Sequence, residues 1–177
     1  MTKNANSQNG EVCIEVNGLW KIFGANIEQA LSPELRTATK ETVLEKTGAV
    51  VAVRDVSFKV NRGELFVIMG LSGSGKSTLI RCLLRLIEPT AGQIIMNGED
   101  ICEYNEKQLL HLRRNTTGMI FQHFGLLPHR NVIDNVSYGL KIKGVDKEER
   151  YARAQETIAK VGLKGWEDYY PDTLSGG

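Results

Sequence analysis

Residues Gly70 to Ser77 have the types and the spacing of a loop that binds phosphate. They read Gly-Leu-Ser-Gly-Ser-Gly-Lys-Ser and fit the pattern Gly-x4-Gly-Lys-Ser. Glycines let the backbone turn tightly, so that successive N–H groups can point at phosphate oxygens. A helix that begins at the end of the loop adds partial positive charge at the same place. The segment therefore predicts a site for a polyanion such as a nucleoside triphosphate.

Three side chains at the end of this pattern have predicted roles. Lys76 would reach the β- and γ-phosphates, and the Ser77 hydroxyl would ligate a Mg²⁺ ion that bridges them. Thr78 would support the α-phosphate. The predicted nucleotide-binding residues are Gly70, Leu71, Ser72, Gly73, Ser74, Gly75, Lys76, Ser77 and Thr78. The alternative is a decayed loop, although a chance match is expected in well under about 1% of chains of this length.

The elements on either side of the loop fit this prediction. Leu65 to Met69 is a continuously apolar run, which is typical of a parallel strand buried on both faces. From Ser77 onward, leucine and isoleucine recur at helical spacing until Pro89. The order strand, loop, helix is the context in which this pattern binds phosphate.

Two alternating segments precede the loop and predict strands. Apolar and polar residues alternate from Val12 to Val16 and from Val56 to Val60. Between them lies an insertion, about residues 25–49. Within it, Ser32 as N-cap and Pro33 at the first helical position predict a short helix that stops near Gly48.

The segments after the loop suggest a change of architecture along the chain. Residues 93–96 and 118–121 resemble strands and are separated by a predicted helix over 106–114, whereas helical character dominates beyond Pro128, notably over residues 147–163. The expected organisation is a disordered tail over 1–10, a nucleotide-binding core with a β-subdomain over 11–122, and a helical subdomain over 123–177.

Composition excludes several other classes of protein. The 177 residues carry 22 Lys+Arg and 21 Asp+Glu, a net charge of +1, so no global field attracts nucleic acid or an anionic membrane. The three cysteines form no CxxC or Cys/His pattern, which favours a reducing cytoplasm over metal or redox chemistry. The longest apolar run, Leu65 to Leu71, is far shorter than the roughly 18 residues that span a bilayer. We expect a chain that is neither secreted nor membrane-spanning.

Two later motifs distinguish among proteins with such a loop. Gln122 lies in Ile-Phe-Gln-His-Phe, and the chain ends in Leu-Ser-Gly-Gly at Gly177. Each alone would be an ordinary surface residue or loop. In this order after the phosphate loop they resemble the Q-loop and the LSGG signature of the ATP-binding-cassette (ABC) family. The resemblance implies an α/β fold: a P-loop NTPase core with an N-terminal antiparallel β-subdomain and part of an α-helical subdomain.

The resemblance also implies roles for individual residues and names ATP and Mg²⁺ as the cofactors. Phe23 stands where the family has an aromatic residue that stacks on adenine, with packing in the core as the alternative. Gln122 would contact Mg²⁺ or the attacking water. Ser175, Gly176 and Gly177 would contact the γ-phosphate bound by the opposite subunit, so that two ATP molecules join a head-to-tail homodimer.

The type of ABC protein is suggested by two further segments. Phe124 to His129 looks like the importer form of this region, which receives a permease subunit. The insertion, together with residues 70–90, is similar to the importers of glycine betaine, proline betaine and choline. The implied protein lies peripherally on the cytoplasmic face of the inner membrane. Its partners would be the permease, a second copy of itself and, indirectly, an extracytoplasmic substrate-binding protein, with no nucleic acid.

Other functions remain open from the sequence. An importer of another substrate, such as an amino acid, is the nearest alternative. A soluble ABC protein acting on nucleic acid or ribosomes would need basic clusters, and Lys141, Lys143 and Lys147 are too sparse.

The resemblance further implies residues that these 177 do not include. The family continues past the signature to a strand ending in a Mg²⁺-binding aspartate, then a catalytic glutamate and a switch histidine. We therefore expect a fragment of a longer protein that binds ATP weakly at best and does not turn it over. The strand beside Leu65 to Met69 would also be missing, so its edge would be unpaired.

Overall fold

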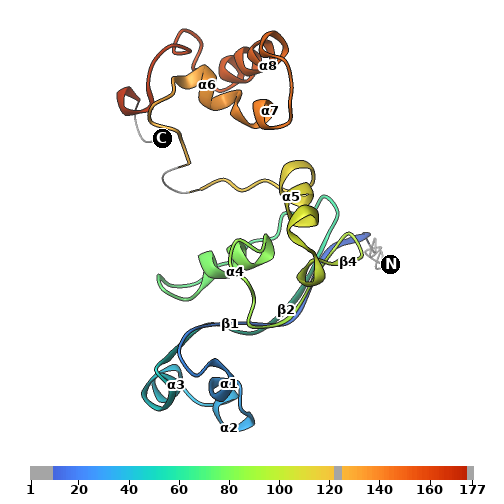
Figure 1. Cartoon of the computed structure of the whole chain (residues 1–177), viewed down its shortest axis with the longest axis vertical. Coiled ribbons are helices and arrows are strands. Elements are labelled where there is room, and N and C mark those ends of the chain that lie inside the picture. The colour runs from blue at the N-terminus through green and yellow to red at the C-terminus, as the bar shows by residue number, and fades with distance from the viewer. Residues whose placement is uncertain (1–9, 122–124, 175–177) are drawn as a thin grey trace, which may run out of the picture. The chain divides into compact units, whose positions relative to one another are not determined.

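The computed structural model describes residues 10–121 and 125–174. The chain divides into two compact units, Met1–Thr117 and Gly118–Gly177 (Figure 1), and each is described by itself.

The first unit is built on an antiparallel sheet with the strand order β2-β1-β3-β4. Its two long strands, β1 (Val12–Gly24) and β2 (Ala49–Asn61), pair along their whole length, from Val12 opposite Asn61 to Gly24 opposite Ala49. The short strands β3 (Ala91–Met96) and β4 (Glu99–Asp100) extend the sheet beyond β1. The strands predicted from alternation and at residues 93–96 are confirmed, and β1 and β2 are longer than expected.

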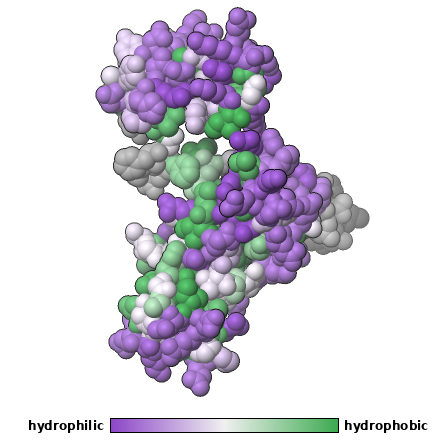
Figure 2. Space-filling model, viewed as in Figure 1, coloured by the Kyte–Doolittle hydropathy of each residue, from purple (hydrophilic) through white to green (hydrophobic). Residues whose placement is uncertain are grey.

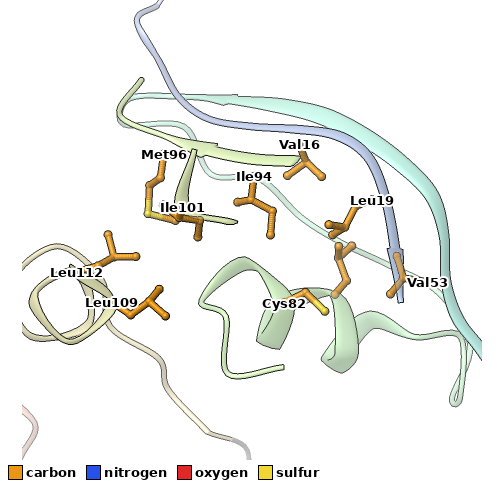
Figure 3. Close-up of a cluster of buried hydrophobic side chains, with 10 residues drawn as sticks. Val16, Leu19, Val53, Cys82, Ile94, Met96, Ile101, Leu109 and Leu112 are labelled. Carbon is orange, nitrogen blue, oxygen red and sulfur yellow. The ribbon is translucent and has the colours of Figure 1, made fainter. Parts of the chain in front are cut away.

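One face of this sheet carries the larger hydrophobic core. It is covered by α4 (Lys76–Leu83), the 3-10 helix η1 (Ile101–Glu103) and α5 (Glu106–Asn115), the last confirming the helix predicted over 106–114. Figure 3 shows Leu19 and Val53 pointing from the two long strands toward Cys82 of α4. The buried members of this cluster are Val16, Leu19, Val53, Leu79, Cys82, Ile94, Met96, Ile101, Leu109 and Leu112.

A second core forms where the insertion folds against the far end of the same hairpin. Successive side chains of a strand point to opposite faces, so Leu19 belongs to the first core and its neighbour Trp20 to the second. Three short helices supply the rest: α1 (Ile27–Ala30), α2 (Pro33–Arg36) and α3 (Lys40–Thr47). The buried members are Trp20, Ile22, Ala30, Leu35, Val43, Ala49 and Val51.

The single helix predicted within the insertion is two helices. Pro33 does begin α2, and Gly48 does end α3 with φ of 71°. Between them the chain leaves the helical path, because the Thr39 side chain accepts a hydrogen bond from the Thr42 N–H and so caps a new helix.

The segment Leu65 to Met69 is not a strand, contrary to the prediction. Leu65 and Met69 are 90% and 86% exposed, and hydrophobic residues reach the surface of this unit in Figure 2. An extended segment becomes a strand only beside a hydrogen-bonding neighbour, and the sheet of the described residues contains none for it. The strand expected over 118–121 is absent for the same reason, with Ile120 fully exposed.

The helix after the phosphate loop is shorter than the periodicity predicts. It ends at Leu83, and Arg85 has a φ of 46°, in the left-handed region. The Arg85 guanidinium donates to the carbonyl oxygens of Ile101 and Tyr104, at 2.7 and 2.8 Å, and these contacts hold the turn.

The second unit is helical, which confirms the prediction for residues beyond Pro128. It contains α6 (Val132–Val136), α7 (Tyr138–Ile142), α8 (Lys147–Lys160) and the 3-10 helix η2 (Pro171–Thr173). Its core is formed by Val132, Ile133, Ala154 and Ile158. The face of this unit that Figure 2 shows is mostly hydrophilic. In the described part of the chain, no helix is both long and apolar enough to cross a membrane.

Leu19 tests whether β1 anchors the larger core. Leu19 is fully buried, whereas Leu44 on α3 is 49% exposed. We predict that Leu19→Ala lowers the free energy of unfolding by about 2–5 kcal/mol, because it leaves a cavity, while Leu44→Ala changes it by less than about 0.5 kcal/mol. Urea unfolding measures both, and equal effects of the two substitutions would contradict this packing.

Candidate nucleotide-binding site

The phosphate loop is attached to the sheet through the backbone of Gly75. Gly73 and Gly75 have φ of 77° and 96°, a region that side chains disfavour. A Cβ atom on Gly75 would lie only 2.1 Å from the carbonyl oxygen of Ala52 in β2. Only glycine allows the loop to approach the strand so closely, so the loop is positioned by β2 even though the segment before it forms no strand.

A β-bulge in β2 brings that carbonyl to the loop. Lys21 of β1 lies opposite Val53, and the next residue, Ile22, lies opposite Val51. Ala52 is therefore an extra residue without a partner in β1. A bulged residue interrupts the ladder of hydrogen bonds between the two strands. The carbonyl of the bulged Ala52 is the group that the Gly75 backbone approaches.

The first turn of α4 presents unpaired N–H groups beside the loop. Gly75 is the N-cap residue and supplies no side-chain hydrogen bond, and the first turn contains no acidic residue. The first N–H groups of a helix have no acceptor within the helix, and they carry its partial positive charge. The backbone N–H groups of Lys76, Ser77 and Thr78 are in this position and suit an anion.

The Lys76 side chain folds back across the loop. Its Nζ donates to the carbonyl oxygens of Gly70 and Leu71, each at 2.7 Å, and lies 3.4 Å from the Ser74 Oγ. The Ser74 N–H donates to the Leu71 carbonyl at 3.2 Å and closes the turn. The ammonium group is thus held at the loop by neutral carbonyls.

Phe23 lies near the end of β1, close to the loop along the sheet. It pairs with Val50 of β2, two residues from Ala52, and two residues of a strand span about 7 Å. Phe23 is 40% exposed and belongs to neither hydrophobic core of the first unit. The Lys21 Nζ lies 4.7 Å from the centroid of its ring. An exposed aromatic ring and a phosphate-type loop therefore lie at neighbouring positions along the same hairpin.

The two ends of the insertion are joined tightly beside Phe23, which the sequence analysis missed. A Cβ atom on Gly24 would lie 2.8 Å from the Gly48 carbonyl oxygen. The Asn26 side chain donates to the Thr47 carbonyl at 3.0 Å, and the buried Thr47 hydroxyl accepts from the Ala49 N–H at 3.0 Å. The sequence feature that could have indicated this junction is the pair of glycines, Gly24 and Gly48, at the two ends of the insertion.

Several predicted site residues lie outside the described residues. They are Gln122, Ser175, Gly176 and Gly177, and their proposed roles stay predictions. Among the described residues, no group of three or more His, Cys, Asp or Glu side chains could hold a metal ion. The exposed Ser77 supplies one oxygen at the loop, which fits a Mg²⁺ ion that takes its other ligands from phosphate and water.

The cysteine nearest the loop is not a chemical group of the site. Cys82 of α4 is fully buried in the first core, and burial raises the pKa of its thiol, while the nearby Lys21 ammonium partly opposes that rise. A buried, protonated thiol is a poor nucleophile and a poor metal ligand.

Comparison with known proteins identifies the family. Residues 53–177 match the family described as "ABC transporter". The chain belongs to the ABC transporter family. The resemblance inferred from the motifs is thereby confirmed.

Relatives of this ABC protein are transport ATP-binding proteins. The chain is 52% identical over 164 residues to the glycine betaine/carnitine transport ATP-binding protein GbuA of Listeria monocytogenes, covering 93% of this chain and 41% of that protein. It is 45% identical over 164 residues to the glycine betaine/proline betaine protein ProV of Escherichia coli, with the same coverage of 93% and 41%. It is 50% identical over 168 residues to the trimethylamine N-oxide protein TmoW of Ruegeria pomeroyi, covering 95% and 49%. The chain thus spans less than half the length of these relatives.

Solved ABC cassettes have the same fold. A dimeric post-hydrolysis state of an ATP-binding cassette bound to ADP and Pi superimposes with a TM-score of 0.73 at 26% identity, covering 92% of this chain and 63% of the other. A dimeric bacterial ABC transporter cassette gives the same TM-score of 0.73 at 27% identity, also over 92% and 63%. The predicted α/β fold class is confirmed.

Gly75 and Gly73 form a matched pair that tests the attachment of the loop. Both have positive φ, but a Cβ on Gly73 would meet nothing within 4 Å. We predict that Gly73→Ala costs about 1–2 kcal/mol from backbone strain alone. Gly75→Ala should cost more, because the Ala52 carbonyl must also move. Urea unfolding of the two variants measures the difference, and an equal cost would contradict the contact.

Proposed function

We propose that this chain is the nucleotide-binding portion of the ATPase subunit of an ABC importer for glycine betaine, proline betaine, choline or a related methylated amine. The observation that carries the proposal is the loop from Gly70 to Ser77, which Gly75 attaches to β2 beside the unpaired N–H groups of α4. The names of relatives that are 45–52% identical over 93% of the chain support the transport role.

In this proposal the loop and α4 bind the triphosphate through backbone amides. The N–H groups around Ser74 to Ser77 donate hydrogen bonds to the phosphate oxygens. The Lys76 ammonium gives up its hydrogen bonds to the carbonyls of Gly70 and Leu71 and binds phosphate in their place. Phosphate carries negative charge that a neutral carbonyl lacks, so its Coulombic attraction to the ammonium group favours the exchange. A Mg²⁺ ion held by Ser77 would neutralise charge on the phosphates.

The remaining predicted residues complete the site in the assembled transporter. Phe23 stacks on adenine, an interaction worth about 1–3 kcal/mol for a base on an aromatic face. Its exposure outside both cores supports that role over packing. Gln122 contacts Mg²⁺ or the attacking water, and residues 175–177 contact a nucleotide bound by a second copy. The dimeric state of the two similar cassettes supports the homodimer.

The same proposal assigns partners and location. The subunit lies on the cytoplasmic face of the inner membrane, bound to a permease that works with an extracytoplasmic substrate-binding protein, and it does not bind nucleic acid. The names of the relatives as transport ATP-binding proteins support this assignment.

An importer of an amino acid is the second candidate. A methionine import ATP-binding protein of Halalkalibacterium halodurans is 48% identical, but only over 132 residues and 75% of this chain. The matches to the glycine betaine proteins extend over 164 of the 177 residues and must include part of the insertion at 25–49. This longer match favours the methylated amines.

Lys76 provides the test of nucleotide binding. Lys76→Ala should weaken the affinity for Mg·ATP by at least about tenfold, because it removes a charge-assisted contact to phosphate. Isothermal titration of the 177-residue chain measures the affinity. The control is Lys107→Ala on α5, an exposed lysine away from the loop, which should bind as the wild type does. Undiminished affinity of Lys76→Ala would exclude the proposed site.

Turnover is a separate question, because the expected aspartate, glutamate and histidine of the family are not among these 177 residues. Without a general base and a complete metal shell, positioning and charge stabilisation of the reaction are both lost. We therefore predict that the 177-residue polypeptide by itself releases no phosphate from ATP above background. A steady-state phosphate-release assay measures this, and sustained turnover would contradict it.

A further inference from the structure

Lys21 is a half-buried lysine of β1 whose ammonium group lies over an aromatic ring. The Lys21 Nζ is 4.7 Å from the centroid of the Phe23 ring, within the distance at which a cation is attracted to a ring face. Within residues 10–121 and 125–174, no carboxylate lies within 4 Å of this ammonium. The ammonium group therefore faces the Phe23 ring and the buried, protonated Cys82 thiol, and not an acidic side chain.

The Phe23 ring has little else to fix its orientation. It is 40% exposed and packs in neither core, although its backbone is held by pairing with Val50. A ring that is free to rotate must lose rotamer entropy when a base stacks on it, and that loss weakens binding. A side chain that orders the ring beforehand would reduce this loss.

We propose that Lys21 is a positioning residue for the nucleotide base: its ammonium covers one face of Phe23, fixes the ring, and leaves the opposite face for adenine. The inference rests on the proposed function, in which Phe23 stacks on the base. It adds a residue outside the phosphate loop that acts on the base and not on the phosphates.

A direct contact between Lys21 and phosphate is the competing explanation that the test must exclude. Lys21 lies opposite Val53, whose Cγ2 is 3.9 Å from the position of a Cβ on Gly75, so the phosphate loop is close. The two explanations differ in whether the base is required for the effect of Lys21.

The experiment compares Mg·ATP with inorganic tripolyphosphate, which has no base, in titrations of the 177-residue chain. Lys21→Met keeps the length of the side chain and removes its charge. It should bind Mg·ATP about two- to fivefold more weakly and tripolyphosphate as the wild type does. Lys21→Arg should restore the affinity for Mg·ATP, because a guanidinium also stacks on aromatic faces. Lys107→Met serves as the control for loss of a positive charge.

The variant Phe23→Ala completes a double-mutant cycle. If Lys21 acts through the ring, Lys21→Met should have no further effect on Mg·ATP affinity in the Phe23→Ala background. If Lys21→Met also lowers the midpoint of thermal unfolding, Lys21→Gln replaces it in the same cycle. A loss of Mg·ATP affinity that persists in the Phe23→Ala background overturns the proposal.

Each other outcome has a distinct meaning. Weaker tripolyphosphate binding by Lys21→Met would overturn the proposal in favour of a phosphate contact. Unchanged Mg·ATP affinity in Lys21→Met, with weaker binding by Phe23→Ala, would overturn it while the proposed function stands. Undiminished Mg·ATP affinity in Lys76→Ala would instead remove the proposed function itself.

Discussion

The close approach of the Gly75 backbone to the Ala52 carbonyl is the constraint on which the candidate site depends. A glycine is required because any side chain would overlap the carbonyl oxygen, and Ala52 is available because it is a bulged residue of β2. Through this contact the β1–β2 hairpin positions the loop and the start of α4. The segment before the loop contributes no strand, so the connection to β2 replaces the support that the sequence pattern suggested.

The same hairpin positions the other end of the site. Phe23 and Lys21 lie on β1, opposite the part of β2 that meets the loop. The two ends of the insertion, which hydrogen bonds hold together, come directly after Phe23 in the chain. The proposed base contact and the proposed phosphate contact are thus held by two paired strands within one unit. A change that loosened the pairing of β1 with β2 would alter both contacts together, because both are held by this hairpin.

Local patterns predicted the elements whose partners lie within the described chain. Alternation at Val12 to Val16 and at Val56 to Val60 was correct because these strands pair with each other and bury one face. The equally apolar run from Leu65 to Met69 was misleading, since apolar residues become a strand only beside a neighbour. The helix expected from Ser32 to Gly48 divides at Thr39, where a hydroxyl cap competes with helix continuation. The spacing of apolar residues indicates which side chains become buried when a neighbouring element is available. It does not indicate whether that element is present.

The sequence by itself determined the family and predicted the chemistry of the phosphate loop, because both depend on residue types at short, fixed spacings. A phosphate site is predicted from Gly70, Gly75, Lys76 and Ser77 without any knowledge of distant contacts. Only the tertiary structure decided where that loop is attached and what surrounds Phe23. The bulge at Ala52, its contact with Gly75 and the Lys21 ammonium over the Phe23 ring all arise from pairing and side-chain packing in three dimensions. Strand register and ring contacts depend on the whole hairpin, so no local pattern encodes them.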